Sequence, residues 1–178
     1  QQRDRIFVIP ATTEVAISYL NLINGKSANH AGGIENYGIL TLNSCQISGN
    51  QSATKGGGVY SDSLARLVII NSIISGNLAR DGGGIYSRSS IVEIINSTFS
   101  GKSATENGGG YYVYGGTLDI GNTILALNNS GNDGADVYKK GNGNVVICNF
   151  NLVGDATGLE TVISEGTITN LDPLFQQE

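Results

Sequence analysis

Apolar and polar residues alternate over short segments of this chain, and these segments recur about every 26 residues. Five segments superpose without gaps, at 15–25, 40–50, 67–77, 92–102 and 118–128, and 146–155 continues the series. Alternation of this kind has the period of a β-strand. A fixed repeat of this length indicates a solenoid, in which each turn of chain buries its apolar face against its neighbours.

The superposed segments place apolar residues in three columns that we expect to face the interior. The first column is Val15, Leu40, Leu67, Val92, Leu118 and Val145. The second is Ile17, Leu42, Ile69, Ile94, Ile120 and Ile147, and the third is Leu22, Ile47, Ile74, Phe99, Leu125 and Leu152. The column between the first two should face solvent and consists of Ala16, Thr41, Val68, Glu93, Asp119 and Val146.

A glycine cluster and a second predicted strand follow each segment. The strings GGGVY (56–60), GGGIY (82–86), GGGYY (108–112) and GADVY (134–138) place tyrosines at a constant interval, and Glu35 takes this position one turn earlier. The residue before each of these should point inward and the tyrosine outward. We expect Tyr60, Tyr86, Tyr112 and Tyr138 to stack roughly 4.8 Å apart as an aromatic strip. The strip could dock a glycan or a partner protein, or the rings could only shield the strand edge.

These patterns predict an all-β fold, a right-handed parallel β-helix of about six turns with about 26 residues each. We expect one domain over 1–178, with an incomplete first turn at 1–14, regular turns at 15–158, and a last turn and cap at 159–178. Asn71, Asn96, Asn122 and Asn149 recur at one corner and predict a structural ladder, because Asn tolerates a left-handed bend and stacked amides can hydrogen-bond along the axis. Ser44 and Tyr19 hold this position in earlier turns.

Composition excludes several functions. The formal net charge of −5 argues against a nucleic-acid partner or an anionic membrane surface, and no apolar segment is long enough for a transmembrane helix. Asp62 and Arg88 lie at equivalent positions one turn apart and predict an exposed ion pair.

The recurring N-S-x-I-S-G-N followed by G-G-G-I-Y resembles the repeats of secreted bacterial right-handed parallel β-helix proteins of the choice-of-anchor and CSLREA type. The chain is also similar to polymorphic outer-membrane protein repeats, whose signatures are G-G-A-I and F-x-x-N. Gly83-Gly84-Ile85 and Ile74-Ser75-Gly76-Asn77 match these signatures, whereas Phe99-Ser100-Gly101-Lys102 departs at its last residue. The resemblance covers about 15–175, including the closing segments 151–155 and 170–175. It implies an extracellular or cell-surface location and a structural or adhesin-like role.

Parallel β-helices also include polysaccharide lyases and hydrolases, so the chain has a catalytic alternative. Glu93 and Asp119 would lie in one outward column on successive turns, as paired carboxylates. No basic residue joins that column, and turns of nearly constant length leave little room for a deep cleft. Segment 131–138 resembles one nonapeptide of the calcium-binding β-roll type, which makes Asp133 and Asp136 the alternative metal ligands. It could equally be a variant of the glycine corner, and no other cofactor is expected.

Two functions therefore stay open. The first is a non-catalytic extracellular module that serves as a scaffold, an adhesin-like segment or part of a filament. The second is a polysaccharide-binding or pectate-lyase-like polysaccharide-cleaving protein. Because Ile6–Ile9 already read as a strand, we expect residues 1–14 to abut a preceding domain or another copy of the chain.

Overall fold

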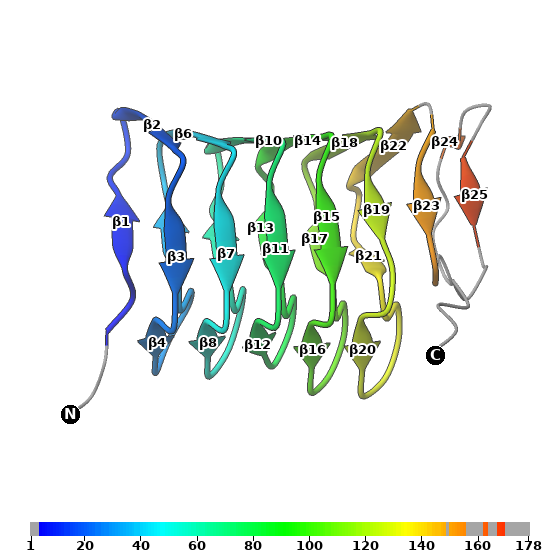
Figure 1. Ribbon diagram of the computed structural model, residues 1–178, viewed down its shortest axis with the longest axis horizontal. Helices are drawn as coiled ribbons and strands as arrows, with labels where there is room; N and C mark the ends of the chain where they lie inside the picture. Colours follow the sequence, from blue (N-terminus) through cyan, green and yellow to red (C-terminus); the bar gives the residue numbers. More distant parts are fainter. Residues whose placement is uncertain (1–3, 149, 156–161, 164–166, 170–178) are drawn as a thin grey trace.

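The computed structural model describes residues 4–148, 150–155, 162–163 and 167–169. Every regular element among them is a β-strand, and the strands form a coil of about six turns (Figure 1). The predicted parallel β-solenoid is therefore confirmed. Each strand pairs in parallel with the equivalent strand one turn away, so that four sheets run along the axis of the coil.

The four sheets are called A to D in the order in which the chain visits them. Sheet A contains β1 (Phe7–Ile9), β5 (Ile34–Asn36), β9 (Val59–Ser61), β13 (Ile85–Arg88), β17 (Tyr111–Tyr114) and β21 (Val137–Lys140). Sheet B contains β2 (Glu14–Ser18), β6 (Ile39–Asn43), β10 (Arg66–Ile70), β14 (Ile91–Ile95), β18 (Thr117–Gly121), β22 (Asn144–Cys148) and β24 (Val162–Ile163).

Sheet C contains β3 (Asn21–Ile23), β7 (Gln46–Ser48), β11 (Ile73–Ser75), β15 (Thr98–Ser100), β19 (Ile124–Leu125), β23 (Leu152–Val153) and β25 (Ile168–Thr169). Sheet D is short and contains β4 (Lys26–Ser27), β8 (Gln51–Ser52), β12 (Leu78–Ala79), β16 (Ser103–Ala104) and β20 (Asn129–Ser130). The turns that carry sheet D project along the lower side of Figure 1.

The interior is filled by the predicted apolar columns. Leu40, Leu67, Val92, Leu118 and Val145 are paired in register along sheet B, and all of them are buried. Strand β1 pairs with β5, so the strand predicted within Ile6–Ile9 is present. The cap predicted at 159–178 lies mostly outside the described residues, which there comprise 162–163 and 167–169.

The third apolar column ends on a different residue from the one predicted. Leu125 pairs with Val153, which is buried, whereas Leu152 is only partly buried and pairs with Ile124. The placement of Leu152 in the core was wrong because the preceding corner is one residue longer. Phe150 has the positive φ of 55° that the repeat predicts one residue earlier, at Asn149, which lies outside the described residues.

Asn71, Asn96 and Asn122 lie at the predicted corner between sheets B and C. Their φ angles are 51°, 51° and 50°, in the left-handed region. Ser44 and Tyr19 have the same conformation in the earlier turns. The amide of Asn96 donates a hydrogen bond to Oδ1 of Asn71 at 3.3 Å, so this corner is stabilised along the axis.

Candidate functional site

The tyrosine column stacks as expected, but its rings are not exposed. Tyr60, Tyr86, Tyr112 and Tyr138 are aligned in register along sheet A. Their successive ring centroids are 5.7, 4.6 and 4.9 Å apart, and the last pair is tilted. The first three residues are only 2%, 4% and 5% exposed. An open aromatic strip on the surface was therefore the wrong expectation.

The turns after sheet D cover these rings. The hydroxyls of Ser52 and Thr54 donate to the carbonyl of Asn29 at 2.6 and 2.9 Å, which holds two consecutive turns together. From these turns His30 stacks on Tyr60, and the ammonium of Lys55 lies 4.9 Å from the centre of the Tyr86 ring. Burial raises the pKa of both Tyr60 and Tyr86, so these phenols stay neutral.

A groove of about 510 Å³ runs between the covering turns and sheet A. Tyr86, Tyr112 and Tyr114 contribute to its wall, and Tyr114 is 43% exposed. The other lining residues are polar or charged, namely Lys55, Arg80, Asp81, Arg88, Glu106, Asn107 and Lys140. These residues come from successive turns, so the groove follows the axis of the coil.

The groove carries an excess of positive charge in an acidic chain. Arg80 contacts Asp81 at 3.4 Å and Glu106 at 3.8 Å, so its charge is balanced. The predicted cross-turn ion pair between Arg88 and Asp62 is present, with N and O 3.6 Å apart. Lys55 and Lys140 have no ion-pair partner among the residues that the structure describes.

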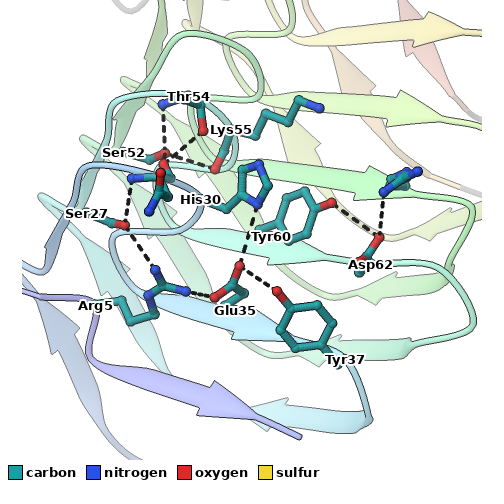
Figure 2. Close-up of polar contacts among 12 residues, drawn as sticks. Arg5, Ser27, His30, Glu35, Tyr37, Ser52, Thr54, Lys55, Tyr60 and Asp62 are labelled. Carbon is teal, nitrogen blue, oxygen red and sulfur yellow. Dashed lines mark hydrogen bonds and ion pairs between the residues drawn. The ribbon is translucent and has the colours of Figure 1, made fainter. Parts of the chain in front are cut away.

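A buried polar cluster closes the N-terminal end of the tyrosine stack (Figure 2). Glu35 takes the position of a tyrosine, in register with Tyr60, and its side chain is only 6% exposed. Arg5 forms an ion pair with one carboxylate oxygen, and the hydroxyl of Tyr37 donates to the other at 2.8 Å. Nδ1 of His30 lies 3.5 Å from that second oxygen. Glu35 is thus buried with its charge balanced.

His30 is mainly a packing element in this cluster. Its ring centroid is 4.3 Å from that of Tyr60, with an angle of 15° between the planes. Burial first, and then the positive charge of Lys55, lower the pKa of His30. These effects outweigh the negative charge of Asp62, which acts in the opposite direction. His30 therefore extends the aromatic stack as a neutral ring near pH 7.

Glu93 and Asp119 are adjacent on the outside of sheet B, as predicted. They are paired in register on β14 and β18 and border a shallow groove of about 260 Å³. Arg66, from a neighbouring column, contacts Glu93 with N and O 3.2 Å apart. No histidine or lysine lines this groove among the described residues. The geometry gives the two carboxylates a neighbouring cation, the Arg66 guanidinium.

Asp133 and Asp136, the alternative calcium ligands, lie in different environments. Asp133 is exposed, whereas Asp136 is buried and accepts hydrogen bonds from the backbone and side chain of Asn128 and from the backbone N–H of Asp155. Three N–H donors therefore contact the Asp136 carboxylate. The described residues contain no group of three or more His, Cys, Asp or Glu side chains suited to a metal ion.

Sequence reasoning missed the basic lining of the groove. Lys55, Arg80 and Lys140 occupy different positions in their repeats, so no column signals them. Glu35 did carry a signal, since it interrupts the tyrosine column, but its partner Arg5 comes from an irregular segment.

No family model, curated protein or solved structure matches this chain. Within the described part of the chain, no helix has the length and apolar character needed to cross a membrane.

Proposed function

We propose that this chain is a non-catalytic, adhesin-like module of the bacterial cell surface that holds an extended acidic polysaccharide in the groove beside sheet A. The observation that carries the proposal is a pair of lysines, Lys55 and Lys140, that have no ion-pair partner in the described part of the chain and lie at a groove with an exposed aromatic wall. An extended polymer fits because the lining residues come from successive turns, so the groove follows the axis of the coil. The closely packed coil supplies a rigid support, so little ordering is needed on binding.

Charge and aromatic contact would act together on such a ligand. Carboxylate or sulfate groups would be attracted by Lys55 and Lys140, and a sugar ring could pack on the exposed face of Tyr114. Neutral glycans would lack the first interaction. The remaining acidic surface of the chain would disfavour contacts elsewhere, which confines an anionic ligand to this groove.

Titration calorimetry with polygalacturonate and with neutral dextran tests the proposal. We expect binding to polygalacturonate only, weakening as salt is raised. Lys140→Glu should reduce the affinity about tenfold or more, since a hydrogen bond to a charged group is worth about 1.5–3 kcal/mol. Lys26→Glu makes the same change of charge on β4, away from the groove, and should bind as the parent does.

Equal binding of both polymers, or equal losses of affinity in the two variants, would contradict the groove as the binding site. A reducing-end assay on the same polymer tests the catalytic alternative. If the parent protein produces new reducing ends, and Glu93→Gln and Asp119→Asn do not, the protein is a polysaccharide-cleaving enzyme and the proposed non-catalytic function is wrong.

A further inference from the structure

A second asparagine column lies inside the coil, at the corner between sheets C and D. In Asn50, Asn77 and Asn128 the side-chain oxygen accepts a hydrogen bond from the backbone N–H of the preceding turn, at 2.8, 2.9 and 3.1 Å. The amide nitrogen of each donates to a carbonyl of that same preceding turn. In the turn between Asn77 and Asn128 this position is Lys102.

Lys102 is enclosed in the interior. The residue is 1% exposed, and its Nζ lies 4.6 Å from the centre of the Phe99 ring. A Cβ at Gly84 would overlap the aliphatic stem of Lys102, so a glycine is needed to accommodate it. Among the described residues no carboxylate lies within ion-pair distance of this amine.

The amine instead meets a carboxamide, with Nζ of Lys102 3.4 Å from Oδ1 of Asn128. The backbone N–H of Lys102 donates to this same oxygen at 3.1 Å. On the other side, Nδ2 of Asn128 donates to Oδ1 of Asp136 at 2.6 Å. Asp136 is itself only 3% exposed. An amine, a carboxamide and a carboxyl group are thus in contact in sequence, and the amine and the carboxyl group belong to buried residues.

We propose that Lys102 and Asn128 form an intramolecular isopeptide bond in the folded protein, with Asp136 as the proton relay. The bond would join two consecutive turns of the coil. Lys102, which interrupts the asparagine column, would then be linked covalently to the asparagine of the next turn along the axis.

The reaction needs no cofactor or oxidant. The lone pair of Nζ attacks Cγ of Asn128, and the negative charge that develops on Oδ1 is stabilised by the backbone N–H of Lys102. Asp136 gives its proton to Nδ2, which it contacts, and regains one from Nζ once that nitrogen is bonded to Cγ of Asn128. The bond between Cγ and Nδ2 then breaks, ammonia leaves, and an amide joins Nζ to Cγ.

The protonation states suit this reaction. Burial holds the pKa of the Lys102 amine well below its usual range, so its neutral, nucleophilic form is accessible. Burial also raises the pKa of Asp136, which favours the protonated acid that the leaving nitrogen requires.

Intact mass spectrometry of the denatured full-length chain tests the proposal. We expect a mass lower than the sequence mass by one ammonia, about 17 Da. Tryptic digestion should yield one peptide of residues 89–139 that is uncleaved after Lys102 and about 17 Da lighter than its sequence mass, because trypsin does not cut at an acylated lysine. A folded parent protein that keeps the full sequence mass after prolonged incubation overturns the proposal, and a loss of one water instead moves the bond to a carboxylate and overturns the role of Asn128.

Lys102→Asn is the matched control, because it restores the residue that the neighbouring turns use at this corner. It should fold and keep its full mass. A loss of ammonia that persists in it would come from another amide side chain, Gln1 included, and would overturn the assignment. Asp136→Asn should fold, as judged by circular dichroism, and react more slowly by at least tenfold. An unchanged rate in Asp136→Asn overturns the relay.

Discussion

The imidazole ring of His30 lies parallel to the phenol ring of Tyr60, with their centroids 4.3 Å apart. The chain has no other histidine, and this one continues the tyrosine stack over Glu35, which replaces tyrosine in that turn. The stack therefore ends on a ring that can acquire a charge.

Acidification should weaken the fold through this ring. Because the pKa of His30 is lower in the folded protein than its usual 6.5, the unfolded chain binds the proton more readily. Stability from His30 is present above pH 6.5 and is lost as the pH falls through and below that value. Urea unfolding followed at pH 7.5 and pH 5.5 measures the change, and His30→Phe, which retains the stacking without the charge, should show a smaller loss. Equal losses in both proteins would contradict this origin.

The buried ion pair of Arg5 and Glu35 should show strong coupling. Arg5→Met leaves the Glu35 carboxylate buried without its cation and should lower the free energy of unfolding by about 3 kcal/mol. Adding Glu35→Tyr restores the residue of the column and should recover much of that loss. A double-mutant cycle in urea checks this, and simple additivity of the two changes would show that the pair is not coupled.

Two neighbouring isoleucines on β11 should differ sharply in how much free energy of unfolding is lost when each is replaced by alanine. Ile74 is fully buried, whereas Ile73 is 51% exposed on the opposite face of the same strand. Ile74→Ala should cost about 2–5 kcal/mol, since it leaves a cavity between adjacent turns. Ile73→Ala should cost less than about 1 kcal/mol. Chemical denaturation of both variants provides the test, and similar costs would contradict the inward column.

Glycines in the coil should also divide into those that tolerate substitution by alanine and those that do not. A Cβ at Gly83 would overlap the carbonyl oxygens of Ser103 and Gly109 in the next turn, so Gly83→Ala should prevent normal stacking and severely reduce the yield of folded protein. Gly101 has open space around its Cα and a φ of 62°. Gly101→Ala should therefore fold with a loss of only about 1–2 kcal/mol, from the left-handed backbone. Thermal melts and soluble yield measure the difference.

The columns that repeat in the sequence were predicted well, because each inward residue meets its own equivalent one turn away. Ile47, Ile74 and Phe99 follow this rule. Exposure was harder to predict. The burial of Tyr86 depends on how the turn with Lys55 folds over the ring, and a turn of varied sequence carries no periodic signal.

Contacts between different columns could not be predicted either. Arg66 reaches Glu93 from a neighbouring column, so the search within one column found no basic residue. The shift at Val153 arose because a single extra residue at a corner moves every later inward position by one.

The corners between sheets A and B vary in length, and this has a use in protein engineering. They comprise residues 10–13, 37–38, 62–65, 89–90, 115–116 and 141–143, and Leu64 at the third is 98% exposed. The glycine corners cannot vary in this way, because neighbouring carbonyls occupy the space beside them. Foreign peptides grafted between sheets A and B would therefore emerge in a regular row on one edge, with their spacing set by the rise between adjacent strands.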